Sequence, residues 1–230
     1  MCGRINVSDN EGVRLLLAML GMDVWPTRDP RFNVAPSQTL DVVQWLDEAP
    51  TLKPMKWGVL PSWAKPGKFS APLINARSET VREKPSFRTL IAKHRVLVPV
   101  NGFYEWHRDG KIKTPYFIKP SDADAMFLAG LYQPIPKSKQ DDSEQREQVC
   151  VVTLAANETF SRVHHRMPVI LNPDEALKWI QESDVETIDG LMQPASNDAL
   201  TLTEVSDYVN SARNEGPECV SAKRVGDLFG

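Results

Sequence analysis

A chain of 230 residues with 41% hydrophobic and 25% charged side chains has the composition of a globular protein and is long enough to bury a substantial core. Its apolar runs are too short to cross a bilayer, and no secretory signal segment starts the sequence. We therefore expect a cytoplasmic protein, associated with the nucleoid in a bacterium, or a nuclear one in a eukaryote. The formal net charge of −3 argues against a protein that coats duplex DNA nonspecifically.

The thiols and the charges are unevenly distributed. Cys2, Cys150 and Cys219 are odd in number and lack CxxC spacing, which predicts separate reduced thiols with no disulfide framework and no bound metal. Between Ser62 and Lys119 there are 12 Lys or Arg against 4 Asp or Glu, which leaves 15 basic and 26 acidic residues elsewhere. This segregation predicts a positive groove that attracts a polyanion, and a solvated face without a partner is the alternative.

The first part of the chain predicts one helix and two strands. After an N-terminal strand, residues 8–21 form an amphipathic pattern, with Ser8 as the expected cap, Glu11 three residues later and Gly21 as the stop. Residues 40–46 and 52–60 then have the pattern of strands. A proline-broken, aromatic loop follows, and after it "LINARSET" and a helical region that ends near Ile91.

The second part predicts more strands than helices. Residues 94–119 have the pattern of a β-hairpin that turns at Asp109-Gly110. Residues 125–132 and 147–156 are predicted strands, and the polar segment 136–147 between them is a predicted exposed loop. A helix with a proline near its start is expected over 172–183. We expect one α+β domain over residues 1–230, with a mainly antiparallel sheet closed into a barrel-like core, short flanking helices and a C-terminal tail at 218–230.

Cys2 follows the initiator methionine, which is usually trimmed before a small residue. We expect Cys2 to become the first residue, so that its α-amine, which titrates near about 7.7 to 8.0, lies next to its thiol. Such an amine condenses with an aldehyde to an imine, and the thiol then closes a five-membered thiazolidine. If the thiol acts alone, its target could instead be an amide. The alternative to both is that Cys2 is incidental and has no chemical role.

Glu105 lies in "GFYEW" on the predicted hairpin, where strand alternation places it on the same face as Phe103. A carboxylate among aromatic side chains loses hydration, which raises its pKa and suits it to proton transfer near neutral pH. A structural glutamate paired with an arginine is the alternative.

"HHRMP" places two histidines and an arginine before a proline that favours extended backbone. In such a segment His164 and Arg166 share a face, while His164 and His165 point apart and cannot chelate one metal ion. One of the two residues on the shared face could act as an acid or base and the other could bind phosphate. Surface histidines in a loop are the alternative.

Polar and aromatic side chains accompany this group. Asn75 and Arg77 in "INARSET" share a face of an extended segment, and an asparagine can fix an adduct by donating and accepting hydrogen bonds. Trp57 is expected in the core, whereas Trp63 in the proline-flanked loop is the better candidate to stack on a base. The sequence has no GxSxG, P-loop, GxGxxG or HExxH motif.

Seven short motifs, "MCGR", "NVAP", "WGVLPSW", "INARSET", "GFYEW", "HHRMP" and "VSDYVN", occur in the order and spacing typical of one family. From Cys2 to about Pro217 the chain resembles the SOS response-associated peptidase (SRAP) family. The resemblance implies a sensor and shield of abasic sites in single-stranded DNA, in which the N-terminal cysteine forms a thiazolidine crosslink with the ring-opened sugar aldehyde. It implies no cofactor, and we expect a monomer that binds neither metal nor membrane.

The resemblance also implies site roles. It assigns Cys2 as the nucleophile, Asn75 as the residue that hydrogen-bonds the adduct, Glu105 as general acid and base, and His164 as an assistant in ring opening and imine proton transfer. It implies a DNA path lined by Arg4, Pro36, Trp63, Arg77, Trp106, Thr153 and Arg166. The older family label implies a thiol autopeptidase that removes its own leader, which here is Met1 alone.

Two rival functions remain at this stage. A peptidase would use the Cys2 thiol on an amide, with help from Glu105 and His164. A noncovalent reader of modified DNA would not need Cys2. Weak lyase activity is expected besides crosslinking, because an imine at C1′ of the sugar promotes β-elimination of the 3′ phosphate.

Overall fold

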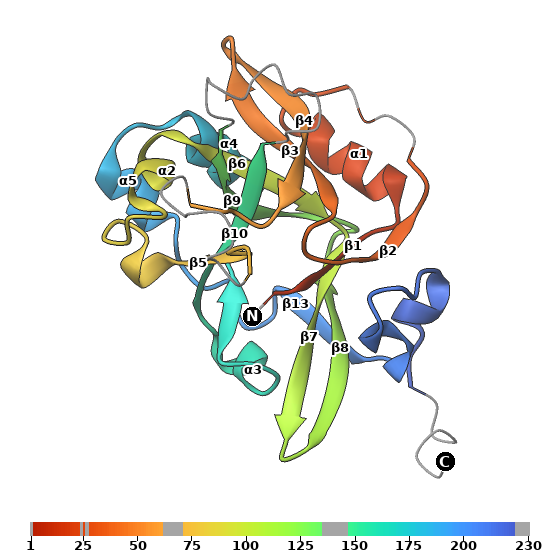
Figure 1. Ribbon diagram of the computed structural model, residues 1–230. Coiled ribbons are helices and arrows are strands. Elements are labelled where there is room, and N and C mark those ends of the chain that lie inside the picture. The colour runs from red at the N-terminus through yellow and green to blue at the C-terminus, as the bar shows by residue number, and fades with distance from the viewer. Residues whose placement is uncertain (1, 24, 26–27, 62–70, 135–146, 224–230) are drawn as a thin grey trace.

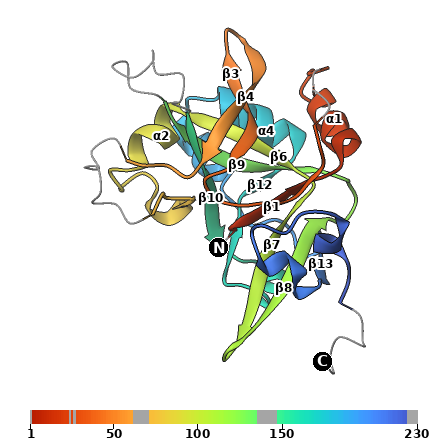
Figure 2. The same cartoon turned by 45° about the vertical axis from the view of Figure 1, so that its right-hand side comes forward.

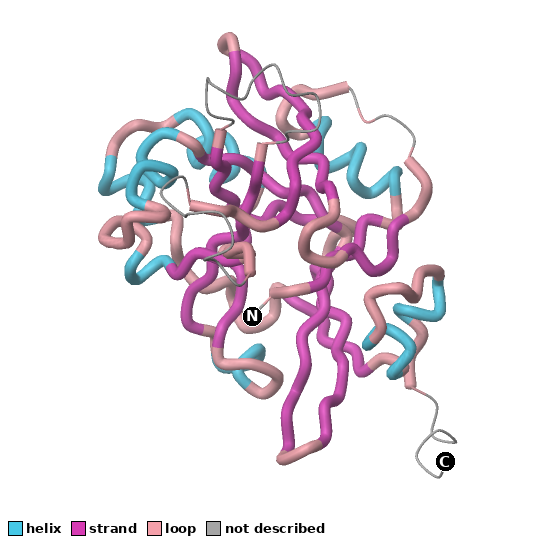
Figure 3. Tube along the Cα trace, in the orientation of Figure 1, coloured by secondary structure: helices cyan, strands magenta, loops and turns pink. Residues whose placement is uncertain are grey.

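The computed structural model describes residues 2–23, 25, 28–61, 71–134 and 147–223. Two antiparallel-rich sheets dominate it, and helices lie at the periphery (Figure 3). The predicted α+β class is confirmed. Trp63, most of the predicted loop at 136–147, and residues 224–230 lie outside the described residues.

The smaller sheet has the strand order β13-β8-β7-β1-β2. Its strands are β1 (Arg4–Val7), β2 (Arg31–Val34), β7 (Gly102–Asp109), β8 (Ile112–Pro120) and β13 (Leu200–Glu204). The first strand of the chain therefore lies inside this sheet, between β2 and β7. Its N-terminal end reaches the middle of the molecule (Figures 1 and 2).

The larger sheet has the order β11-β10-β4-β3-β6-β9-β12, and β5 pairs with β10. Its strands are β3 (Thr39–Leu46), β4 (Ala49–Trp57), β5 (Asn75–Arg77), β6 (Arg95–Val100), β9 (Met126–Gln133), β10 (Gln148–Ala155), β11 (Arg166–Pro168) and β12 (Ile170–Leu171). Among the pairings of the described strands, only those of β10 with β4 and β5 are parallel, so the sheet is mainly antiparallel as expected.

A further pairing of β9 with β10 closes β10, β4, β3, β6 and β9 into a ring. The ring is not a clear barrel. The register between β3 and β6 is reduced to Val43 opposite Leu97, and β4 meets β10 at only Lys56 and Trp57. The core is therefore a closed ring of strands, as expected, but it lacks the regular geometry of a barrel.

The helices are short and are capped locally. They are α1 (Asn10–Ala18), α2 (Arg88–Lys93), α3 (Glu158–Ser161), α4 (Pro173–Gln181) and α5 (Val185–Gly190), with 3₁₀ turns η1 (Ser78–Thr80), η3 (Asp207–Asn210) and η4 (Pro217–Val220). The predicted cap Ser8 is wrong, because the Asp9 side chain accepts from the backbone N–H of Glu11 and starts α1 one residue later. The helix ends at Ala18 with Met19 as its C-cap, three residues before the expected stop, and Gly21, with φ +74°, lies in the turn that follows.

The hairpin that carries "GFYEW" forms as predicted, with a different turn register. Asp109 pairs with Ile112, so the two-residue turn is Gly110-Lys111, and Gly110 has φ +57°. The preceding run Arg95–Val100, which the sequence joined to this hairpin, instead forms β6 in the other sheet. The β7–β8 hairpin projects from the body beyond α3 (Figure 1).

One large core joins residues of both sheets with α1 and α4, and a small second cluster lies beside the five-stranded sheet. Trp57 is fully buried, as predicted, and Trp179 of α4 donates its indole N–H to carbonyls of both β6 and β9. The small cluster joins Tyr104 to Val205, Val209 and Cys219. Residues from 218 onward were expected as a tail, but the buried Cys219 lies in η4 and anchors this segment.

Candidate active site at the start of the first strand

The sheet register brings Cys2 to Glu105. Strand β1 pairs with β7 through Arg4 opposite Tyr104 and Ile5 opposite Phe103, so the residues just before β1 lie alongside Glu105. Cys2 is 2% exposed. Burial raises the pKa of its thiol, and the negative charge of Glu105 raises that pKa further. The free thiol is therefore protonated at neutral pH and needs a base to become a nucleophile.

Glu105 is only 3% exposed on β7. Loss of hydration raises the pKa of its carboxyl above the ordinary range. Phe103, two residues earlier on the same face of the strand, packs against Phe160 of α3 with ring centroids 5.9 Å apart. This face of β7 is thus directed at the segment that follows α3, which is where His164 lies.

His164 completes a carboxylate–imidazole pair. Its Nε2 lies 3.3 Å from Oε1 of Glu105, and its Nδ1 lies 3.0 Å from the backbone nitrogen and 3.1 Å from the carbonyl oxygen of Arg166. Burial chiefly lowers the pKa of His164 to about 4, so the ring is neutral at neutral pH. A neutral imidazole next to a carboxyl group of raised pKa can pass a proton in either direction.

The backbone around His164 differs from the expectation. Residues 162–163 form a turn, and β11 begins only at Arg166. The rings of His164 and His165 consequently stack with centroids 4.3 Å apart instead of pointing to opposite faces. Proline at position 168 constrains the residue directly before it, and its influence does not reach back to the histidines.

Asn75 reaches the same place from the edge of the other sheet. It begins β5, which pairs in parallel with β10 through Val151 opposite Asn75. Its Nδ2 donates to the Cys2 carbonyl oxygen at 3.1 Å. Its Oδ1 is buried and has no hydrogen-bond partner among the described residues. An unpaired buried acceptor costs free energy, so it is an obvious place for a donor from a bound molecule.

The residues expected along the DNA path lie at different depths. Arg77 is exposed on β5 and Pro36 is half-buried in a turn where Ser37 has φ +74°. Trp106 is half-buried, and the Arg4 guanidinium carbon lies 5.8 Å from the centroid of its ring. These side chains are available at or near the surface around Cys2.

Thr153 and Arg166 lie deeper than the others. Thr153 is fully buried and Arg166 is 8% exposed. The Arg166 guanidinium donates to Glu79 and to the backbone oxygen of Thr153, the latter at 2.6 Å. In this arrangement both residues hold β10, β11 and η1 together, and their contact with DNA stays a prediction.

Sequence reasoning missed a network that fixes Arg4. Asn33 is fully buried, and its Oδ1 accepts from Arg4 at 2.7 Å, while its Nδ2 donates to carbonyls of Val209, Ser211 and Asn214. Arg4 also donates to carbonyls of Val209 and Asn210. Asn33 is the first residue of "NVAP" and Asn210 is the last residue of "VSDYVN". The sequence therefore contains both motifs, but it does not show that they are in contact.

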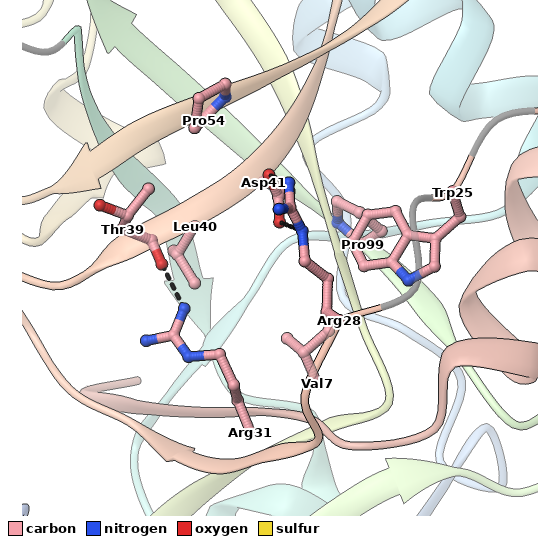
Figure 4. A pocket seen from close by; sticks show the side chains of 9 residues that line it. All are labelled: Val7, Trp25, Arg28, Arg31, Thr39, Leu40, Asp41, Pro54 and Pro99. Carbon is pink, nitrogen blue, oxygen red and sulfur yellow. Dashed lines mark hydrogen bonds and ion pairs between the residues drawn. The ribbon is translucent and has the colours of Figure 1, made fainter.

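A hollow of about 210 Å³ lies away from this site between β2, β3 and the segment after α1. Arg28 and Arg31 line it, but the first is bonded to Asp41 and the second to the Thr39 carbonyl (Figure 4). Because both guanidinium groups already bind the protein, this hollow is a weaker candidate for anion binding than the region around Cys2.

Two absences apply to the described residues alone. No cluster of three or more His, Cys, Asp or Glu side chains in that part of the chain could hold a metal ion. Nor does any helix there have the length and apolar character needed to span a membrane.

The fold and site together define an α+β protein in which a cysteine, a carboxylate, an imidazole and an amide meet at the start of the first strand. The chain belongs to the SOS response associated peptidase (SRAP) family, whose model matches residues 1–212.

Named relatives agree with this assignment. The chain is 35% identical over 196 residues to "Abasic site processing protein YoqW" of Bacillus subtilis, covering 84% of this chain and 86% of that protein. It is 30% identical over 231 residues to "Abasic site processing protein YedK" of Escherichia coli, covering 96% and 99%. It is also 35% identical over 194 residues to "Abasic site processing protein HMCES" of Gallus gallus, covering 74% of this chain and 56% of that longer protein.

A solved structure shares the fold. A protein from Bacteroides thetaiotaomicron superposes with a TM-score of 0.82 at 26% identity, covering 97% of this chain and all of the other. The similarity therefore extends over both sheets and the helices around them.

Proposed function

We propose that the protein processes abasic sites in single-stranded DNA by capturing the ring-opened sugar on Cys2. The observation that carries the proposal is the convergence of Cys2, Asn75, Glu105 and His164 from four distant segments on one buried point. The names of the relatives support the substrate class. The proposal requires that Met1 has been removed, because an amine held in a peptide bond cannot form an imine.

The chemistry runs in two bond-forming steps. The α-amine of Cys2 adds to the C1′ aldehyde, and loss of one water molecule gives an imine. The thiol then adds across the C=N bond, its sulfur bonding to C1′ and its proton passing to nitrogen, which closes a thiazolidine ring. Ring closure makes the adduct more durable than a lysine imine, which hydrolyses.

Each neighbouring side chain has a task in these steps. Glu105, with its raised pKa, gives a proton to the departing hydroxyl group and regains one from the nitrogen in the first step, and it relays the thiol proton to that nitrogen in the second. His164, neutral and 3.3 Å from Glu105, assists sugar ring opening and relays protons. Asn75 holds the Cys2 backbone through its amide N–H and offers its buried Oδ1 to a hydroxyl or N–H of the adduct.

Single-stranded DNA is the form of substrate that this surface favours. Arg4, Arg77 and Trp106 surround the buried point with positive charge and an aromatic ring, which suits a strand with splayed bases. An imine at C1′ also acidifies the C2′ protons, so slow β-elimination of the 3′ phosphate accompanies capture as a weak lyase activity.

The experiment uses a uracil-containing oligonucleotide treated with uracil glycosylase. The processed protein should convert it to a heat-stable, slower-migrating species. A Cys2→Ala variant should not, and intact mass should confirm that residue 2 is first. If the alanine variant forms the heat-stable species as well as the parent does, the proposal is wrong.

A Cys2→Ser variant is the matched control, because it keeps the α-amine and loses the thiol. It should give an adduct only when borohydride reduces the imine. A heat-stable adduct without reduction would argue against the thiazolidine. Cleavage of peptides by the parent without DNA crosslinking would support a peptidase, and unchanged DNA binding without any covalent species would support a noncovalent reader.

A further inference from the structure

A hollow of about 430 Å³ opens beside the candidate active site, along the projecting β7–β8 hairpin. Glu105 and His164 line one side of it. The other side is lined by three residues of the β7–β8 hairpin, Trp106, Arg108 and Lys113. Arg108 and Lys113 have no part in the active-site roles given above.

Arg108 and Lys113 lie directly opposite each other across the hairpin. Like charges in this position destabilise a strand pair. Both residues are exposed, and neither has an acidic partner within 4.0 Å in the part of the chain that the structure describes. Because this pair of like charges does not stabilise the folded protein, we attribute it to the binding of an anion.

The balance of charge in the hollow is positive. The Arg4 guanidinium lies on its wall and donates to the Asn33 side chain and to the carbonyls of Val209 and Asn210, all of which are neutral. No acid of the described segments forms an ion pair with it. Among the described residues that line the hollow, Glu105 is the only acid, and burial favours its neutral form. The hollow is thus lined by three cations, Arg4, Arg108 and Lys113, and by one carboxyl group whose raised pKa favours its neutral form.

The aromatic wall of the hollow is fixed in place. The indole N–H of Trp106 donates to Oδ1 of Asn210 at 2.6 Å, and Arg4 lies toward its ring. An indole beside two free cations suits a nucleotide, which offers a ring to stack and a phosphate to bind. A flanking nucleotide would therefore reach the hollow while the sugar is held at Cys2.

We propose that Arg108 and Lys113 bind the phosphodiester of a nucleotide that flanks the captured sugar, so that the β7–β8 hairpin fixes the strand on one side of the lesion. This inference rests on the proposed function. The charge of Arg108 also acts on the catalytic pair, since after burial and other groups it contributes to lowering the pKa of both Glu105 and His164. A bound phosphate would offset that charge.

Binding is measured with oligonucleotides that carry a tetrahydrofuran abasic analogue, which has no aldehyde and cannot crosslink. An Arg108→Gln/Lys113→Gln double variant should bind about 5- to 20-fold more weakly, and the slope of log affinity against log salt should fall by about 0.7 for each lost contact. Lys119→Gln is the matched control, because Lys119 is exposed on the same hairpin but does not line the hollow. It should bind like the parent.

Neutral methylphosphonate groups, placed one at a time along the strand, locate the contact. At one position flanking the lesion, the methylphosphonate should weaken binding by the parent but leave binding by the double variant unchanged. Equal weakening by Lys119→Gln, or a loss that is the same at every position, would overturn the inference. Crosslinking by the parent to a true abasic oligonucleotide is measured in parallel, since its absence would instead count against the proposed function.

Discussion

Nε2 of His164 lies 3.3 Å from Oε1 of Glu105, although Glu105 belongs to β7 and His164 lies 59 positions later, in the segment between α3 and β11. Burial shifts their pKa values in opposite directions, raising that of the acid and lowering that of the base. Both groups are thereby driven toward their neutral forms, which brings their proton affinities closer together and favours proton exchange between them.

Glu105→Gln should slow crosslinking by about 10²-fold or more, because the amide keeps the shape of the side chain and cannot transfer a proton. The variant should retain the parent's circular dichroism spectrum. Gel analysis of the crosslink at several times gives the rate. An unfolded variant would instead indicate a structural glutamate.

The same substitution should have the opposite effect on alkylation of Cys2. The charge of Glu105 adds to burial in raising the pKa of the thiol, so its removal should increase the thiolate fraction. Mass spectrometry after brief iodoacetamide treatment should show faster labelling of Cys2. Cys150 serves as the internal control, because burial raises its pKa to about 12 and it lies in the core. Slower labelling of Cys2 in the variant would contradict the assigned contact.

His164 should make the protein less stable as the pH falls from about 6.5 to about 4. In that range the unfolded chain binds a proton on this side chain while the folded protein, with its pKa lowered to about 4, does not. The free energy of unfolding therefore rises with pH across this window. Melting temperatures of a His164→Gln variant should show a weaker dependence between pH 5 and 7 than those of the parent. His165→Gln, an exposed neighbour, should keep the parent's dependence.

Asn33→Ala should lower the free energy of unfolding by about 1 to 3 kcal/mol, because it removes one of the hydrogen bonds of Arg4 and the three that Asn33 donates to the carbonyls of Val209, Ser211 and Asn214. Residues 207–220 should exchange backbone hydrogen faster, since Asn33 ties this segment to β2. Hydrogen exchange with mass spectrometry measures both effects. Unchanged protection of 207–220 would show that the small cluster around Tyr104 is sufficient to hold the segment.

Gly102→Ala should destabilise the protein by about 1 to 3 kcal/mol and slow crosslinking, because an added Cβ would lie 2.5 Å from the Ile118 carbonyl oxygen at the base of the hairpin. Gly190→Ala is the control. A Cβ there meets nothing within 4 Å, and at the end of α5 the substitution should be neutral or stabilise by up to about 1 kcal/mol. Denaturant unfolding of both variants checks the contrast.

The sequence by itself determined the local elements and the chemical types in the site. Alternation of apolar residues predicted β3, β9 and β10, and Asp109-Gly110 predicted the hairpin that carries Glu105, because these features depend on neighbours within a few residues. The candidate residues Cys2, Asn75, Glu105 and His164 were chosen for the same reason, from side-chain chemistry and short motifs. The wrong cap at Ser8 shows the limit, since Asp9 next to it competes for the same backbone donor.

Only the tertiary structure decided which of these groups meet and how deeply they lie. The pairings of β1 with β7, of β5 with β10 and of β10 with β11 bring the four candidates together, and such long-range register leaves no mark in local periodicity. Burial of Thr153 and Arg166, the stacking of the two histidines and the opposition of Arg108 to Lys113 are likewise products of packing. Solvent exposure and charge separation set pKa values and binding, and both are properties of the folded chain.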